Sequence, residues 1–320
     1  MQEYKISKLS KDQFHLLLPL MKDCFGMDVN LNYFDWKFNQ NPSGFVEGFI
    51  ALTECNEVAA YYGVIPELFN INGEMKIIYQ SCDTMTHSKH RRKGLFQKLA
   101  KTCFDYLEKQ NKLYIYGFGG VDSTPGFMKF GWKHIFNVNY FFLPNFFSFL
   151  TLKKDSSIEE ISEISEISKL LVNSNSQNTN HSIKNTDICK WRISNPLHLY
   201  KIIAHKNEFN EYDAYLIYYL EKNKIVLFDV YYISIKSGKF LINYLKKILK
   251  TGKYKGIITL SKEKTKYAQR LRELGFLYNP FNFGPLSIKI PFIVYTKENN
   301  FNYYNNPDFW EINAFEHDSL

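Results

Sequence analysis

A basic turn that ends in glycine is the clearest chemical signal in the sequence. A strand-like segment, residues 76–86, leads into His-Ser-Lys-His-Arg-Arg-Lys-Gly-Leu-Phe at residues 87–96, and a helical pattern follows. The first backbone N–H groups of a helix have no partners within it, and the helix dipole is positive there, so such a turn attracts phosphate. Arg91, Arg92 and Lys93 add charge-assisted contacts. The turn predicts a site for a phosphorylated ligand, with a solvated basic surface as the alternative.

The elements around this turn alternate between helix and strand. Apolar residues recur at helical spacing over residues 14–25 and 95–107. Segments rich in β-branched and aromatic residues, typical of strands, cover residues 48–52, 58–65, 76–86 and 113–116. We therefore expect an α/β fold, in which a twisted mixed sheet is flanked by helices.

An internal repeat divides the chain into two parts. Trp-Lys-Phe-Asn-Gln-Asn-Pro at residues 36–42 is echoed by Trp-Arg-Ile-Ser-Asn-Pro at residues 191–196. Gly-Leu-Phe at 94–96 matches Gly-Lys-Phe at 238–240, and Phe-Gly-Trp at 130–132 matches Leu-Gly-Phe at 274–276, both at an offset of 144. The sequence predicts two copies of one module. Their ranges are 1–152 and 187–320, joined by a linker at 153–186 that is partly helical and partly mobile.

Composition excludes several classes of protein. With 45% hydrophobic and 17% aromatic residues, the chain of 320 residues is too apolar to be disordered. Five widely spaced cysteines offer neither a disulfide framework nor a metal knuckle, so we expect a cytoplasmic protein without a metal. The polar N-terminus is unlike a signal peptide, and the most apolar stretch, residues 140–152, is too short to span a membrane. That stretch is a buried strand or, as the alternative, an interfacial segment.

The basic turn resembles motif A of the GNAT superfamily of acyl-CoA-dependent acyltransferases, Arg/Gln-x-x-Gly-x-Gly/Ala, although Phe96 replaces the last small residue. Phe-Met-Lys-Phe-Gly-Trp at residues 127–132 is similar to a later signature of that superfamily. The resemblance implies a V-shaped opening between strands 76–86 and 113–116. Pantetheine would lie against the first strand and the pyrophosphate against the basic turn. The implied acyl-CoA ligands are Thr84, Met85, Thr86, Arg91, Arg92, Lys93, Gly94, Leu95, Phe96, Ser123 and Phe127.

The same resemblance implies direct attack of an amine on the thioester, without a covalent enzyme intermediate. An ammonium acceptor must first lose a proton, and Asp83 and His87 are the predicted bases. Strand alternation predicts that Asp83, Met85 and His87 share one face. Phe127 stands where many members have a tyrosine that protonates the leaving thiolate, and a phenyl ring cannot do so. A silent pseudoenzyme is therefore a further alternative.

The second module lacks the basic turn, because Arg91 and Arg92 correspond to Ile235 and Lys236. We expect it to fold like the first and to help bind the acceptor. The chain is similar to two-module sugar N-acyltransferases of surface-polysaccharide pathways, which implies a dTDP- or UDP-linked amino sugar. The predicted acceptor ligands are Trp36, Tyr61, Tyr62, Asp122, Trp191 and Arg192. The alternative is a loop cap for Asp122 and core packing or a plain surface position for the other five.

Two other functions stay open. The acceptor could be another amine, such as an aminoglycoside, a polyamine or a protein terminus. The net charge of +8 could also serve a nucleic-acid-binding protein, but the cations are spread along the chain and no RNA-recognition motif is present. We therefore expect small-molecule partners and no nucleic acid. The sequence does not specify an oligomeric state.

Overall fold

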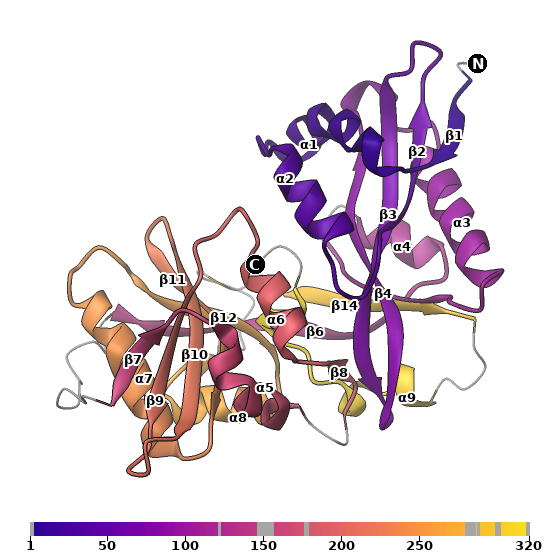
Figure 1. Cartoon of the computed structure of the whole chain (residues 1–320). Helices are drawn as coiled ribbons and strands as arrows, with labels where there is room; N and C mark the ends of the chain where they lie inside the picture. Colours follow the sequence, from indigo (N-terminus) through magenta and orange to yellow (C-terminus); the bar gives the residue numbers. More distant parts are fainter. Residues whose placement is uncertain are drawn as a thin grey trace.

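The computed structural model describes residues 3–120, 123–145, 157–175, 179–278, 286, 289–297 and 302–317, with only the backbone at 302 and 303. Within these residues, fourteen strands form one continuous sheet (Figure 1). Its order is β1-β2-β3-β4-β5-β14-β6-β12-β11-β10-β9-β7, with β8 beside β3 and β13 beside β6. The strands are β1 (Lys5–Lys8), β2 (Glu47–Leu52), β3 (Val58–Ile71), β4 (Glu74–Thr86), β5 (Tyr114–Phe118), β6 (Lys133–Pro144), β7 (Ile158–Ile161), β8 (His181–Ser182), β9 (Lys201–Lys206), β10 (Tyr212–Glu221), β11 (Lys224–Tyr232), β12 (Gly256–Lys262), β13 (Leu277–Tyr278) and β14 (Ile290–Thr296).

Helices cover both faces of this sheet. In the N-terminal half, α3 packs on one face, because its apolar stripe of Leu95, Leu99, Cys103 and Leu107 is buried there. The first helices pack on the other face around Trp36. The helical elements are η1 (Lys11–Leu17), α1 (Leu18–Phe25), α2 (Leu31–Phe34), η2 (Asp35–Asn39), η3 (Ser88–His90), α3 (Leu95–Glu108), α4 (Thr124–Lys129), η5 (Ile164–Ile167), α5 (Ser168–Ser174), α6 (Thr186–Ile193), α7 (Ile235–Leu249), α8 (Lys266–Glu273), α9 (Asn302–Asn305), η6 (Pro307–Phe309) and η7 (Ala314–Glu316).

The C-terminal half repeats this layering. Helices α7 and α8 bury Leu241, Leu245 and Leu271 against one face of the sheet, and η5, α5 and α6 cover the other. The predicted α/β fold, a mixed sheet flanked by helices, is confirmed.

Two strands tie the halves together by exchange. The N-terminal part of β6 pairs with β14, and from Val138 to Pro144 the same strand pairs with β12 of the C-terminal half. In return, β14 inserts beside β5 of the N-terminal half. The sheet therefore runs through both halves without a break, and neither half is complete without a strand from the other.

The segment expected to be a linker differs from that expectation. Its described residues form β7, which pairs with β9, then η5 and α5, and finally β8, which pairs with β3. The isoleucines at 161, 164 and 167, together with Leu170 and Leu171, are at most 7% exposed and belong to one core cluster. The segment is thus partly helical, as expected, but its isoleucines lie in a strand and a short helix that pack on the sheet.

The apolar stretch beginning at Tyr140 is, up to Pro144, part of strand β6, which agrees with the buried-strand interpretation. Phe141 and Leu143 are at most 1% exposed. Residues 146–152 lie outside the described residues. No helix in the described part of the chain has the length and apolar character needed to cross a membrane.

Candidate active site

A cleft opens where β4 and β5 diverge. The two strands pair in parallel from Tyr79 opposite Ile115 to Ser81 opposite Gly117; beyond this point β4 continues to Thr86 paired with β3 but no longer with β5. The resulting cleft has a volume of about 1460 Å³ and is lined on one side by Thr84 and Thr86. The V-shaped opening that the resemblance implied is thus present between the expected strands.

A β-bulge shapes the β4 wall of the cleft. On β3, Tyr61 pairs with Met85 and Gly63 with Cys82, so β4 has one residue more than its partner in this interval. Asp83 adopts a left-handed backbone conformation, with φ of 48°. The bulge breaks the predicted alternation, because such an insertion turns side chains to a new direction. Consequently Asp83 and Thr84 line the cleft together, whereas Met85 is 1% exposed and packs in the core.

The basic turn lies at the mouth of the cleft. Arg91 lines the cleft, and its Nε donates to the carbonyl oxygen of Thr86 over 3.3 Å. Arg91, Arg92 and Lys93 are exposed to solvent. Gly94 caps α3 with φ of 72° and supplies no side-chain acceptor, and the first α-helical bond runs from Lys98 to Gly94. The amide groups at the start of α3 are therefore not capped by a side chain, as an anion site requires.

An aromatic cluster forms the floor behind the turn. Phe96 packs edge-on against Phe127, with ring centroids 5.2 Å apart, and against Phe130 at 5.6 Å. A Cβ at Gly126 would lie 3.5 Å from the Phe96 ring, so α4 approaches closely. Phe96 thus occupies the space between α3 and α4 while still lining the cleft. Ser123 also lines the cleft, and its Oγ accepts a hydrogen bond from the Gly120 amide at 3.1 Å.

Asp83, one of the two predicted bases, forms a buried ion pair. Its Oδ2 lies 2.8 Å from Nζ of Lys37, and the two side chains are only 9% and 1% exposed. Lys37 Nζ also donates to the Tyr33 hydroxyl over 3.2 Å. Asp83 therefore combines the position expected of a base with a structural partner that the sequence did not reveal.

His87, the other predicted base, does not line the cleft. Its Nδ1 accepts a hydrogen bond from the Lys89 amide at 3.2 Å, and its Nε2 lies 3.9 Å from Oδ1 of Asp23. Two hydrogen bonds from Ser88 lower the pKa of Asp23. His87 therefore caps η3 on the outer side of the basic turn, and the prediction of a catalytic position for it is not supported by the geometry.

Two histidines that sequence reasoning missed do line the cleft. His198 stacks on Tyr219 with ring centroids 4.1 Å apart, and burial lowers the pKa of its imidazole, which keeps it neutral near pH 7. His317 lies with its ring 4.5 Å from that of Phe118. Both come from the C-terminal half, far from β4 in sequence, and no local motif marks them.

The residues predicted to bind the acceptor lie elsewhere. Trp36 and Trp191 stack at 5.5 Å, and the Nε1 of each donates to the backbone oxygen of the other, over 2.7 and 2.8 Å. Arg192 forms an ion pair with Glu67 at 2.8 Å in the interior. None of the described members of the predicted set lines the cleft; those residues, Trp36, Tyr61, Tyr62, Trp191 and Arg192, are at most 6% exposed. The burial of all five agrees with the alternative of core packing, and Asp122 lies outside the described residues.

The remaining wall of the cleft is apolar and comes from both halves. Phe25 is the last residue of α1, Met27 lies two residues later, and Leu197 follows α6. These three residues are 48%, 36% and 40% exposed, respectively. Ile290 and Pro291 of β14 complete this wall. Within the described residues, no group of three or more His, Cys, Asp or Glu side chains could hold a metal ion.

Comparison with the sequence models of protein families relates the part of the chain that forms the β4 side of the cleft to a known family. The sequence model of the family described as Acetyltransferase (GNAT) domain matches residues 5–135, which include β4, the basic turn and α3. Residues 5–135 are therefore similar to a GNAT acetyltransferase domain. The match confirms the predicted acyl-CoA-dependent N-acyltransferase at the level of this domain and says nothing about the acceptor. No curated protein is similar enough in sequence to count as a relative.

Solved structures extend the likeness beyond the GNAT domain. A probable N-acyltransferase from Enterococcus faecalis V583 superposes with a TM-score of 0.71 at 12% identity, over 91% of this chain and 72% of that one. A GCN5-related N-acetyltransferase from Anabaena variabilis gives 0.68, also at 12% identity and over the same shares of the two chains. N-myristoyltransferase from Saccharomyces cerevisiae, with bound myristoyl-CoA, gives 0.64 at 12% identity, over 92% of this chain and 79% of that one. At such identities the likeness shows the fold alone.

Proposed function

We propose that the protein transfers an acyl group from acyl-CoA to an amine in the cleft between β4 and β5. One observation carries the proposal: a single cleft joins the basic start of α3 to the bulged end of β4. The pyrophosphate of CoA would lie at Arg91 and the helix start, and the pantetheine arm would extend along Thr84 and Thr86. A GNAT domain over residues 5–135 and a structural neighbour with bound myristoyl-CoA support this assignment.

The chemical step needs few protein groups. The amine nitrogen, once deprotonated, attacks the thioester carbonyl carbon; a C–N bond forms, the C–S bond breaks, and the proton of the nitrogen passes to a base. Asp83 is the base that the sequence proposes, and its position on the cleft wall supports it. Phe127 cannot protonate the leaving CoA thiolate. Because the pKa of a thiol is near 8.5, the thiolate is a good enough leaving group to depart without protonation.

The acceptor is proposed at two levels. The cleft supports a general amine acceptor, because it is wide and open to both halves of the molecule. The finer proposal, a dTDP- or UDP-linked amino sugar of surface-polysaccharide synthesis, rests on the sequence resemblance. The aromatic residues expected to hold the sugar are buried elsewhere and lend it no support.

We also propose that the two halves are copies of one module, of which only the first binds acyl-CoA. Each half contains one parallel strand pair, β4 with β5 and β11 with β12. Each also has a bulge at the corresponding place, since Ile217 pairs with Asp229 and Tyr218 with Leu227, which leaves Phe228 as the extra residue. The reciprocal hydrogen bonds between Trp36 and Trp191 fit two related elements that meet about a local twofold axis.

Calorimetric titration with acetyl-CoA, butyryl-CoA and a hydroxyacyl-CoA tests this function, with dTDP- and UDP-amino sugars, aminoglycosides and polyamines as acceptors. We expect one CoA per chain and turnover with one class of amine. Turnover with an aminoglycoside or polyamine alone would replace the amino-sugar proposal and keep the acyltransferase. Absence of CoA binding under all conditions would remove the proposed function.

A further inference from the structure

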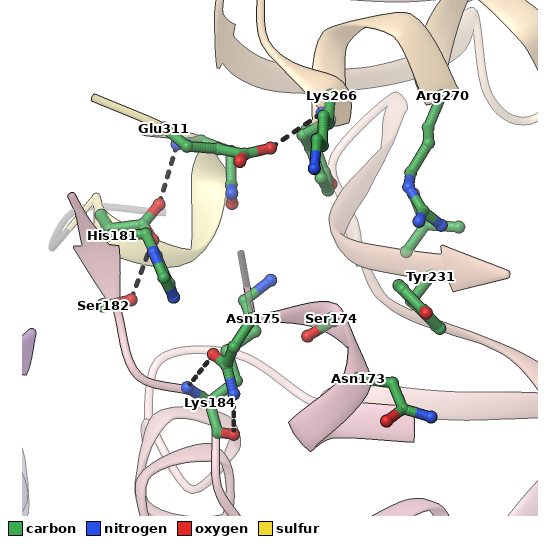
Figure 2. A pocket seen from close by; sticks show the side chains of 14 residues that line it. Asn173, Ser174, Asn175, His181, Ser182, Lys184, Tyr231, Lys266, Arg270 and Glu311 are labelled. Carbon is green, nitrogen blue, oxygen red and sulfur yellow. Dashed lines mark hydrogen bonds between the residues drawn. The ribbon is translucent and has the colours of Figure 1, made fainter. Parts of the chain in front are cut away.

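The C-terminal half contains a second hollow, separate from the cleft. It lies between α5, the end of β11, the start of α8 and the segment 311–316, and has a volume of about 120 Å³ (Figure 2). The two sites share no lining residue. Since its volume is about one-twelfth of the cleft's, the hollow suits a small ligand and not a second coenzyme.

A buried imidazole faces this hollow with one nitrogen unsatisfied. His181 is 6% exposed, and its Nδ1 lies 2.8 Å from the carbonyl oxygen of Thr179. A carbonyl oxygen only accepts, so Nδ1 carries the proton and Nε2 offers a lone pair. Nε2 is buried and has no hydrogen-bond partner in the described part of the chain. Burial also lowers the pKa of His181, which keeps the ring neutral.

A buried acceptor without a partner is unfavourable, and native structures seldom leave one unsatisfied. The arrangement therefore indicates a ligand that donates a hydrogen bond to Nε2.

Cationic side chains surround the same space. Figure 2 shows Lys266 and Arg270 of α8 and Lys184 arranged around the hollow with His181. Lys184 is already paired with Asp229 at 2.7 Å, and Arg270 donates through Nη1 to the Tyr232 carbonyl over 2.7 Å. Lys266 is exposed and forms no ion pair with any described residue, so its charge is available to a ligand.

The two acidic side chains at the hollow, Glu311 and Glu316, already have hydrogen-bond donors. Glu311 accepts a hydrogen bond from the Tyr267 amide over 2.9 Å. Glu316 accepts from the Ser182 hydroxyl and from the Asn313 amide, each over 2.8 Å. Besides these acidic side chains, the hollow offers a ligand the charges of Lys266 and Arg270 and one neutral acceptor, Nε2 of His181.

We propose that this hollow binds a phosphate group, either as free phosphate or as a small phosphate monoester. The P–OH group donates to Nε2 of His181, and the other oxygens accept from Lys266 and Arg270. Near neutral pH phosphate and its monoesters can carry such a proton, whereas sulfate carries none. The site therefore discriminates between two anions of nearly equal size and shape.

The test is calorimetric titration of the full chain in the Arg91→Ala/Arg92→Ala background, so that the basic turn does not contribute anion binding. The probes are sodium phosphate, glycerol 3-phosphate and sodium sulfate at pH 6.5 and equal ionic strength. We expect phosphate or the monoester to bind at least tenfold more tightly than sulfate, roughly 1.4 kcal/mol. The stronger of the two identifies whether the natural ligand is the free ion or an ester.

Three variants and one control variant locate the binding. His181→Asn keeps a donor for the Thr179 carbonyl but removes the acceptor, and we expect about tenfold weaker phosphate binding. His181→Gln places an amide oxygen near the position of Nε2 and should retain more of the affinity. Lys266→Ala should weaken binding of phosphate, while Lys247→Ala, which removes the same charge from the exposed side of α7, should not.

Equal binding of sulfate and phosphate, or phosphate binding unchanged in both His181→Asn and Lys266→Ala, would overturn the proposal. Absence of phosphate binding to the Arg91→Ala/Arg92→Ala protein, in which the hollow is unaltered, would also overturn it. None of these results bears on acyl transfer in the other cleft, which is tested with CoA.

Discussion

The buried pair of Asp83 and Lys37 gives the sharpest test of the catalytic assignment, because Asp83 has both a structural role, in the ion pair, and a proposed chemical role, as the base. The carboxylate and the ammonium are 2.8 Å apart and nearly excluded from water. Removing one member of such a pair leaves the other buried near fewer compensating charges, at a cost of about 3–5 kcal/mol. Replacing both members with neutral groups of similar shape costs much less.

The variants are Asp83→Asn, Lys37→Met and their combination. Asparagine tolerates the positive φ of 48° at position 83, and methionine keeps most of the volume of the Lys37 stem. We expect each single variant to lose roughly 3 kcal/mol of unfolding free energy in urea titrations. The double variant should lose less than either, because the two changes are coupled.

Activity separates the two roles once stability has been restored. The assay is release of the CoA thiol from acetyl-CoA with the panel of amines. If Asp83 accepts the amine proton, the double variant stays at least about a hundredfold slower than the unaltered protein, despite its recovered stability. A double variant with full activity would refute Asp83 as the base, and single variants of unchanged stability would refute the buried ion pair itself.

Three further predictions concern the stability of the protein and rest on buried residues. Burial raises the pKa of Glu316 to about 7, above the value near 4.5 of an ordinary glutamate, so the folded state holds this proton more tightly than the unfolded state. Stability should therefore fall by roughly 3 kcal/mol as the pH rises from about 4.5 to 7, and urea titrations of Glu316→Gln should show that slope largely abolished; an unchanged slope would contradict this assignment. Trp36→Ala and Trp191→Ala should each cost about 3–5 kcal/mol in urea titrations, with a double variant well below their sum because each removes the other's partner; simple additivity would argue against the reciprocal contact. Gly238→Ala should lower the melting temperature, at a cost of about 1–3 kcal/mol, because a Cβ would lie 2.6 Å from the Tyr232 ring; an unchanged melting temperature would contradict the close approach of α7 to β11.

Local patterns predicted the elements well because they depend on neighbours in sequence. The apolar stripe of α3, the strand β4 and the basic turn between them all follow from spacing and residue type over short stretches. The sequence match of Gly238 with Gly94 also corresponds to a similar place in the structure, since each glycine lies at the start of a helix. Its physical cause differs, however: Gly94 permits a positive φ at a helix start, whereas Gly238 makes room for a tyrosine ring.

The parts that failed depend on contacts between distant residues. The bulge at Asp83 is set by pairing with β3, so alternation along β4 alone placed Met85 on the same face as Asp83 and missed its burial. Trp36 and Trp191 were recognised as equivalent, but the sequence could not show that they stack on one another rather than on a ligand. His198 and His317 reach the cleft from the C-terminal half, and neither their place in it nor the pairing of β6 and β14 across the halves leaves a local signature.

The most direct measurement is the affinity for acetyl-CoA of the Arg91→Ala/Arg92→Ala variant, compared with Lys109→Ala/Lys112→Ala. The second variant removes the same charge at the opposite end of α3. Taking about 1.5 kcal/mol for each lost contact between a charged donor and a phosphate, the first variant should bind roughly a hundredfold more weakly. The control should bind as the unaltered protein does. Equal affinity of all three proteins would contradict acyl-CoA binding at the start of α3, and with it the account of this cleft.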